Sequence, residues 1–277
     1  MAKSFKQLLT KDNDTILIVD ALNLAFRYKH QKKRNFAEDY LRTVQSLATS
    51  YNAGTIYITA DWGSSSYRKN LLPEYKQNRK DKYAQQTEQE AQEFADFMDD
   101  YEATLLTLEQ YYPLFRYKNV EADDIAAYLV SKLWKEHTMW LISSDRDWDL
   151  LIHPTVSRFS YVTRKEITAS NWSDHYEVAQ EDYISFKCLT GDAGDNVPGI
   201  PGVGPKRAAS LIQTYGSALD IADAMPLEGK YKYIQATNEF GADGIMRNYE
   251  LMDLVTYCED AVGNENIKHI DEKIRDE

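Results

Sequence analysis

Thr15-Ile-Leu-Ile-Val-Asp20 is a short, almost continuous run of apolar and β-branched residues that ends in a carboxylate. Two other runs have the same pattern, Thr55-Ile-Tyr-Ile-Thr-Ala-Asp61 and Thr138-Met-Trp-Leu-Ile-Ser-Ser-Asp145. Runs of this length that are apolar on both faces are typical of buried parallel strands. The sequence therefore predicts a mostly parallel sheet in which three strands lead into aspartates.

Amphipathic helices are predicted between these strands. One long helix is indicated by apolar residues that step by three and four, namely Phe94, Met98, Tyr101, Leu105 and Leu108. Residues 121–136 carry a second apolar face. This alternation predicts an α/β fold with a central sheet flanked by helices. After Tyr161 the pattern is helical, so we expect an α/β core over residues 1–161 and a helical region over residues 162–277, packed on the core as one compact unit.

The composition excludes several classes of protein. The 277 residues are 43% hydrophobic and carry 32 basic against 44 acidic side chains, a net charge of −12. That balance is typical of a globular chain and not of a disordered one. Cys188 and Cys258 are too far apart in the sequence to suggest a zinc knuckle or a redox pair. With no signal peptide and no apolar stretch of membrane-spanning length, we expect a cytoplasmic protein without a membrane partner. We also expect a monomer.

Three aspartates follow predicted strands. Because the carboxyl ends of parallel strands meet at one edge of a sheet, we expect Asp20, Asp61 and Asp145 to lie close together. The alternative for each is a cap on the helix that follows its strand. Further acids occur nearby or at the spacing of one helical face, and these are Glu121, Asp123, Asp124, Asp147, Asp192 and Asp195.

The acids around Asp145 are densely spaced. If this segment is extended, Asp145 and Asp147 point the same way. Asp149 is followed by Leu150 and Leu151, where a helix is expected to begin, so we interpret Asp149 as a cap.

Nine converging carboxylates would repel one another unless cations were bound between them. Oxygen ligands of this kind suit Mg²⁺ or Mn²⁺. Two such ions can activate a water molecule and stabilise the leaving oxygen of a phosphodiester. A module that only binds DNA is the competing hypothesis, but carboxylates beside phosphates would weaken its binding.

The run Gly191-Asp-Ala-Gly-Asp-Asn-Val-Pro-Gly-Ile-Pro-Gly-Val-Gly-Pro-Lys-Arg-Ala-Ala209 joins the last two acids to a helix–hairpin–helix type of turn. Gly202 and Gly204 allow the backbone to approach a ligand, and Pro205 begins a helix whose N–H groups suit phosphate. The run resembles the signature of the structure-specific 5′-nucleases, which are flap endonucleases and 5′→3′ exonucleases. The blocks VDALNLAFRYKH, LPEYKQNRKDKYAQ, VEADDIAAY and LISSDRDWD are similar to the bacteriophage-encoded branch, and the resemblance spans residues 16–257.

This resemblance implies a fold, a substrate and a set of cofactors. The fold is PIN-like, with a helical arch at about residues 68–90 and a helix–hairpin–helix motif at about residues 185–216. The implied substrate is branched or 5′-flapped DNA, cut near single-strand/double-strand junctions with two or more Mg²⁺ ions, for which Mn²⁺ can substitute. A K⁺ ion at the helix–hairpin–helix turn is also implied. The alternative substrate is an RNA primer in an RNA–DNA hybrid, because parts that grip the backbone do not read the 2′-hydroxyl.

The resemblance also implies residue roles. The first metal position is assigned to Asp20, Asp61, Glu121, Asp123 and Asp124, and the second to Asp145, Asp147, Asp192 and Asp195. Catalytic roles are implied for Arg27, Lys76, Asp145 and Asp192, with Lys76 at the scissile phosphate and Tyr75 stacking an unpaired base. The implied DNA-contacting residues are Arg27, Lys29, Tyr75, Lys76, Arg79, Lys80, Gly202, Gly204, Lys206 and Arg207. A phage-encoded enzyme of this family would act in the host cytoplasm.

Overall fold

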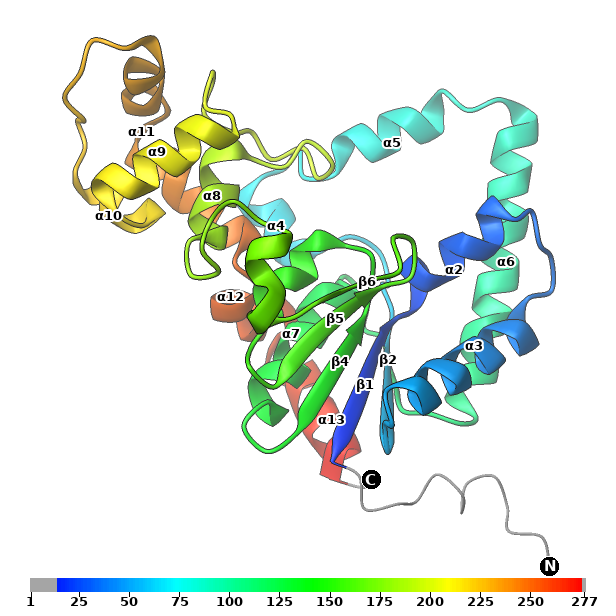
Figure 1. The fold of residues 1–277 in the computed structure, drawn as a ribbon. Helices are drawn as coiled ribbons and strands as arrows, with labels where there is room; N and C mark the ends of the chain where they lie inside the picture. Colours follow the sequence, from blue (N-terminus) through cyan, green and yellow to red (C-terminus); the bar gives the residue numbers. More distant parts are fainter. Residues whose placement is uncertain (1–13, 276–277) are drawn as a thin grey trace, which may run out of the picture. The chain divides into compact units, whose positions relative to one another are not determined.

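The computed structural model describes residues 14–275, and a six-stranded sheet organises much of the chain (Figure 1). Its strand order is β3-β2-β1-β4-β5-β6. The bounds are β1 Thr15–Asp20, β2 Thr55–Thr59, β3 Leu114–Phe115, β4 Thr138–Ile142, β5 Val156–Ser160 and β6 Lys165–Ile167. All neighbouring pairs are parallel except β5 with β6. The predicted sheet is confirmed, and the three strands that lead into aspartates, β2, β1 and β4, are neighbours.

Helices cover both faces of this sheet, as predicted. On one face, α2 (Ala21–His30), α3 (Ala37–Ser50) and α6 (Glu88–Glu109) contribute to one core with Leu17 and Val19 of β1. Successive strand residues point to opposite faces, so the buried Ile16 and Ile18 face the other side. That side is covered by α7 (Ala122–Leu133), which packs against β1 and β2. The long helix expected from the periodicity of residues 94–108 is α6.

Two compact units interleave along the sequence. The first, Met1–Ser65, Gln86–Ser170 and Cys258–Glu277, contains the sheet. The second, Ser66–Gln85 and Asn171–Tyr257, is helical and has its own hydrophobic core, which includes Leu189 and Ile245. Its helices are α4 Ser66–Leu71, α5 Gln77–Ala84, α8 Tyr183–Thr190, α9 Pro205–Tyr215, α10 Ala218–Asp223 and α11 Lys232–Met252. The chain passes between the units four times, and two of these points lie within the 3₁₀ helix η2 (Ala169–Asp174) and α12 (Leu254–Val262).

This grouping differs from a single division after residue 161. Residues 66–85, expected in the core as the arch, group with the helical unit, where Arg68 Nε donates to the carbonyl of Leu251 (2.8 Å). The C-terminal α13 (Asn264–Arg275) groups with the sheet, where the Tyr128 hydroxyl on α7 donates to Asp271 (2.7 Å). Both contacts join segments far apart in the sequence, which local periodicity does not report.

Two features lie at the limits of the sequence predictions. The strands β3, β5 and β6 were not predicted, and β3 and β6, with two and three residues, are too short to show a periodic pattern. The N-terminal segment, for which we predict no signal peptide, falls at residues 1–13 and lies outside the described residues. Among the helices of residues 14–275, none combines the length and apolar character needed to cross a bilayer.

Candidate active site

Asp20 is buried at the end of β1, an interior strand of the sheet. Its Oδ1 accepts a hydrogen bond from the backbone N–H of Asn23 (3.1 Å) and so caps α2, while its Oδ2 accepts from the Ser143 hydroxyl (2.8 Å). Burial, together with the neighbouring carboxylates of Asp61 and Asp145, raises the pKa of Asp20 to about 8. Asp20 is therefore a helix cap and also a member of a carboxylate cluster.

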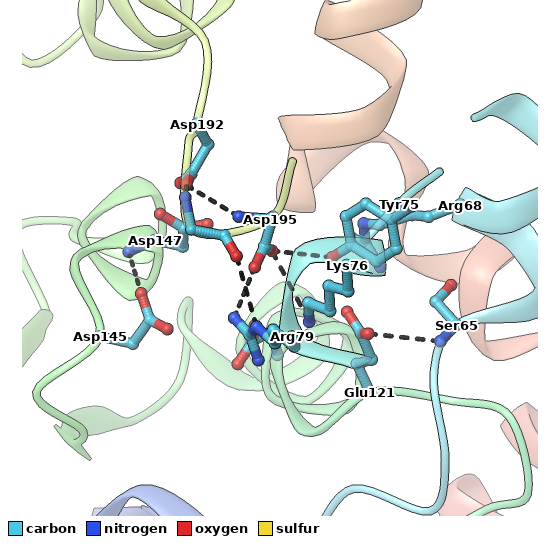
Figure 2. Close-up of polar contacts among 12 residues, drawn as sticks. Ser65, Arg68, Tyr75, Lys76, Arg79, Glu121, Asp145, Asp147, Asp192 and Asp195 are labelled. Carbon is cyan, nitrogen blue, oxygen red and sulfur yellow. Dashed lines mark hydrogen bonds and ion pairs between the residues drawn. The ribbon is translucent and has the colours of Figure 1, made fainter. Parts of the chain in front are cut away.

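Asp61 and Glu121 are positioned by contacts between two loops. The Oδ1 of Asp61 accepts from the backbone N–H of Ala122 (2.8 Å), the first residue of α7. The Oε1 of Glu121 accepts from the backbone N–H of Ser65 (3.3 Å; Figure 2). The loop after β2 and the start of α7 are thereby tied together, which places these two acids at the same edge of the sheet.

Asp123 and Asp124 lie in the first turn of α7, where negative charge is favoured by the helix dipole. The indole Nε1 of Trp148 donates to Asp123 Oδ1 (2.6 Å), and Asp124 is fully buried. Because Trp148 belongs to the segment that follows Asp145, this bond links α7 to that segment. Trp148 was not singled out in the sequence, because an indole donor leaves no distinct pattern.

The Asp145 segment corrects two expectations. Residues Arg146–Leu151 form a 3₁₀ helix, η1, so the extended arrangement of Asp145 and Asp147 is wrong. Asp145 instead caps η1 by accepting from the backbone N–H of Asp147 (2.9 Å). Asp149 is inside η1 and not a cap, because the buried guanidinium of Arg158 pairs with both of its oxygens (2.5 and 2.7 Å). Asp149 is therefore a structural acid beside the functional candidates.

Seven of the nine predicted ligands lie in the first unit, and these are Asp20, Asp61, Glu121, Asp123, Asp124, Asp145 and Asp147. Within residues 14–275, no group of three or more His, Cys, Asp or Glu side chains has the arrangement of a formed metal site. The donors nevertheless fit a hard cation, since all are carboxylate oxygens. Burial is the main cause of the raised pKa of Asp20, and repulsion from Asp61 and Asp145 adds to it; a bound cation would relieve that repulsion.

We expect the metal-free protein to lose stability as the pH rises from about 4 to about 8. In this window Asp20 is ionised in the unfolded chain but still protonated in the folded one, so raising the pH favours unfolding. Asp20→Asn removes this loss and keeps an oxygen that can cap α2. In EDTA, the gain in Tm of Asp20→Asn over the wild type should therefore be larger at about pH 8 than at about pH 5. The control is Asp14→Asn at an exposed position; an equal gain at both pH values would contradict the expectation.

Asp192 and Asp195 lie in a tight loop of the second unit, between α8 and α9. Asp192 and Val197 exchange two backbone hydrogen bonds (2.9 and 2.8 Å), and Asp192 Oδ1 accepts from the N–H groups of Gly194 (2.7 Å) and Asp195 (3.2 Å). Burial raises the pKa of Asp192, but Lys187 and these N–H groups together outweigh burial and hold it below its ordinary value. The loop thus keeps the Asp192 carboxylate ionised and directs it toward the backbone N–H groups of Gly194 and Asp195.

Lys187 is a residue that the sequence reasoning missed. It is only 8% exposed, and its Nζ lies 3.4 Å from Asp192 Oδ2. It is the one charged residue in the α8 sequence YISFKCLT. A signal was present in the sequence, since this lysine is isolated in an apolar helix and lies five residues before Asp192.

Three side chains of the predicted arch converge on Asp195 (Figure 2). The Tyr75 hydroxyl donates to Asp195 Oδ2 (2.9 Å), Lys76 Nζ lies 3.6 Å from the same oxygen, and Arg79 Nη2 lies 2.5 Å from Oδ1. Tyr75 is 4% exposed and belongs to the hydrophobic core of the second unit together with Leu72. Its expected role in base stacking does not fit this position, because packing covers the ring.

The helix–hairpin–helix turn precedes α9, with Gly204 as the N-cap and Pro205 as the first helical residue. Gly202 has φ +75°, a conformation that favours glycine. Arg207 Nη1 donates to the Gly202 carbonyl (2.6 Å) and so holds the turn from within. Both cations expected to contact DNA here are exposed, but the guanidinium of Arg207 is already engaged by the turn.

The remaining predicted DNA contacts lie on helices α2 and α5. Arg27 places its guanidinium 4.2 Å from the ring centroid of Tyr161 and lines a cavity of about 600 Å³. Lys29 Nζ lies 4.5 Å from the centroid of Phe94, and Lys80 is exposed on α5. Arg27 and Lys29 belong to the first unit and Lys80 to the second.

Comparison with family models decides which family the chain belongs to. The model described as 5′-3′ exonuclease, N-terminal resolvase-like domain, matches residues 15–181, which is more than half of the chain. The model described as 5′-3′ exonuclease, C-terminal SAM fold, matches residues 178–273. The chain belongs to the 5′-3′ exonuclease family. The family match continues through most of α13, beyond residue 257, where the motif resemblance ended.

Relatives and solved structures agree with this family. The flap endonuclease of Escherichia phage T5 is 44% identical over 254 residues, which cover 89% of this chain and 86% of the relative. Flap endonuclease Xni of Shewanella oneidensis is 26% identical over 250 residues, or 87% and 89% of the two chains. A structure of T5 5′-exonuclease with bound zinc ions superimposes with a TM-score of 0.91 at 42% identity, covering 95% of this chain and 98% of that one. The nuclease function and the α/β fold predicted from the motifs are confirmed.

Proposed function

We propose that this chain hydrolyses phosphodiester bonds of DNA near single-strand/double-strand junctions, both by cutting 5′ flaps and by degrading strands from a 5′ end. The observation that carries the proposal is the cluster of carboxylates at the edge of the sheet. Burial and the charge of Asp61 raise the pKa of Asp20 to about 8. A fold that holds mutually repelling carboxylates at one edge of its sheet is suited to binding divalent cations and, through them, phosphate. One T5 flap endonuclease structure is a pseudo-enzyme-product complex with DNA and metal ions.

We assign the cofactor as two or more Mg²⁺ ions, with Mn²⁺ as a substitute. When bound, such ions lower the pKa of a water molecule and stabilise the leaving oxygen of the phosphodiester. The proposed ligands of the first position are Asp20, Asp61, Glu121, Asp123 and Asp124, and those of the second are Asp145, Asp147, Asp192 and Asp195. The all-carboxylate character of both sets supports this choice over zinc, which favours nitrogen and sulfur ligands.

The cationic residues of the second unit have the chemistry to hold a phosphate. Lys76 and Arg79 are the partners of Asp195 in the structure, and on binding DNA they exchange this carboxylate for phosphate oxygens. Lys76 then stabilises the charge that grows on the scissile phosphate, and Arg79 and Lys80 attract the single strand. Arg27 supplies a further cation in the first unit.

The helix–hairpin–helix turn is proposed to grip the duplex backbone. The N–H groups at the start of α9 and the exposed Lys206 suit a phosphate. We also propose a K⁺ ion at this turn. Arg207 donates to the Gly202 carbonyl, and it would have to release this oxygen for the ion to bind it.

Chelation is expected to abolish cleavage while leaving DNA binding largely intact. Binding relies on basic residues and on the helix–hairpin–helix turn, whereas hydrolysis needs the divalent ions. The measurement follows cleavage of a 5′-end-labelled flap substrate in Mg²⁺ and in EDTA, alongside the Kd in EDTA and in Ca²⁺. Ca²⁺ is expected to support binding equal to or tighter than that in EDTA. Cleavage that persists in excess EDTA would show that the carboxylates do not act through metal ions.

The same assay separates the competing substrates. A nicked duplex and an RNA–DNA hybrid are cut in parallel with the flap, and faster cleavage of the hybrid would favour action on RNA primers instead. We further propose that the enzyme acts as a monomer in the cytoplasm, which is the host cytoplasm if the protein is phage-encoded.

A further inference from the structure

Trp62 is held beside the candidate active site by its backbone. It directly follows Asp61, and its N–H donates to the carbonyl of Val120 (3.4 Å) while its carbonyl accepts from the N–H of Asn119 (2.7 Å). Val120 immediately precedes Glu121, so these two bonds fix Trp62 next to two of the clustered acids. The position of this tryptophan relative to the carboxylates is therefore set within the first unit.

The side chain of Trp62 is exposed in spite of this fixed backbone. The residue is 51% exposed, whereas Trp148 and Trp172 are buried, and Trp134 and Trp140 are intermediate. A single exposed apolar residue is common on protein surfaces and carries no conclusion by itself.

Arg116 orients the Trp62 side chain from one side. Its guanidinium carbon lies 5.4 Å from the centroid of the indole. That guanidinium is itself fixed, since it donates to both carboxylate oxygens of Glu102 (2.7 and 2.6 Å) and to the carbonyl of Asp61 (3.1 Å). The indole is thus oriented by a residue that also contacts the backbone of the active-site loop, and a ligand that binds it pays little entropy for ordering.

The surrounding charge selects the chemistry of the ligand. A phosphate placed here without metal ions would be repelled by the carboxylates, whereas the face of a nucleobase is uncharged. Stacking of a base on an aromatic side chain is favourable and tolerates any sequence. Bases inside a duplex are already stacked on both faces, so an exposed indole is suited to a base that has left the duplex.

We infer that Trp62 stacks an unpaired base of the DNA strand that is bound at the carboxylate edge. This inference rests on the proposed function and adds a contact that selects single-stranded character next to the site of cleavage. Stacking was assigned to Tyr75 from the sequence, but Tyr75 is 4% exposed. Trp62 directly follows Asp61 and is 51% exposed, so its ring is available to a base.

Binding and fluorescence test this inference without depending on cleavage. In EDTA, the wild type is titrated with a 5′-flapped duplex whose flap carries normal bases, and with one whose flap carries abasic residues. Indole fluorescence should fall on binding the first flap, and this change should be absent with the abasic flap and in Trp62→Phe. For the normal flap, the Kd of Trp62→Ala should be about tenfold higher than that of the wild type, in keeping with the loss of one stacked base. For the abasic flap, the variant and the wild type should have the same Kd. Tyr111→Ala, at another exposed aromatic of the first unit, should bind both flaps as the wild type does.

The outcomes separate the stacking contact from the proposed function. A Kd of Trp62→Ala within twofold of the wild type for the normal flap would overturn the inference. An equal loss of affinity for the normal and abasic flaps would overturn it as well, because the tryptophan would then contact the backbone. If the wild type fails to cleave any flap in Mg²⁺, the proposed function fails; if it cleaves while Trp62→Ala is unchanged, only the stacking inference fails.

Discussion

Asp145→Asn should lower the single-turnover rate of flap cleavage by about a thousandfold or more, equivalent to about 4 kcal/mol of activation free energy. Asp145 is a proposed ligand of the second metal position, and the substitution removes its charge. The fold should be retained, because asparagine caps helices as well as aspartate does and can still accept from the N–H of Asp147. Its charge also raises the pKa of Asp20, so its removal relieves repulsion. The stability of the metal-free variant should therefore equal or exceed that of the wild type.

The chain offers a matched control four residues away. Asp149 lies inside the 3₁₀ helix that Asp145 caps but pairs with the buried Arg158, so Asp149→Asn should destabilise the fold by about 3–5 kcal/mol. The rate per folded molecule of that variant should change much less than that of Asp145→Asn. Thermal unfolding and single-turnover kinetics on both variants distinguish the two roles. If Asp145→Asn unfolds and its activity tracks only the folded fraction, Asp145 is a structural cap.

Lys76→Ala should lower the single-turnover rate at saturating enzyme by about a hundredfold, or roughly 2.7 kcal/mol, with a smaller effect on the Kd. Lys76 is the N-cap residue of α5 and lies beside Asp195, in a segment anchored to the loop that carries this acid. The backbone N–H of Lys76 donates to the carbonyl of Asp195 (2.9 Å), so the position of the side chain is set by the backbone. A cation placed so firmly is suited to stabilising a developing charge.

Lys80 supplies the control for Lys76. It has the same charge, lies in the helix that begins directly after Lys76, and is exposed. Lys80→Ala should raise the Kd modestly, reduce the salt dependence of binding by about one unit and leave the chemical step unchanged. Matching effects of the two substitutions would mean that Lys76 contributes only non-specific attraction.

The sheet and its carboxylate edge were predictable because both follow from local pattern. The runs before Asp20, Asp61 and Asp145 are apolar enough to indicate buried strands, and parallel pairing necessarily brings their ends to one edge. The roles of the acids near Asp145 were less predictable. Asp149 is a structural acid and not a cap because it pairs with Arg158, whose buried charge requires a carboxylate, and this pairing joins β5 to η1.

The contacts of the second unit were hidden for a similar reason. The burial of Tyr75 and the pairing of Lys76 and Arg79 with Asp195 join segments about 120 residues apart, and no periodicity records such distances. The motif resemblance singled out Tyr75, Lys76 and Arg79 as functional candidates, but it did not predict that they contact Asp195. Trp62 shows the converse case, since its importance comes from exposure beside Asp61, which a sequence does not display.

The central claim, that the clustered acids bind the catalytic ions, is tested most directly by measuring Mn²⁺ binding. The electron paramagnetic resonance signal of free Mn²⁺ gives the number of ions bound and their Kd for the wild type, Asp145→Asn and Asp20→Asn. We predict at least two bound ions for the wild type and a weakened or lost ion in each variant, with unchanged circular dichroism. Equal Mn²⁺ binding by all three folded proteins would contradict the assignment of these carboxylates as metal ligands.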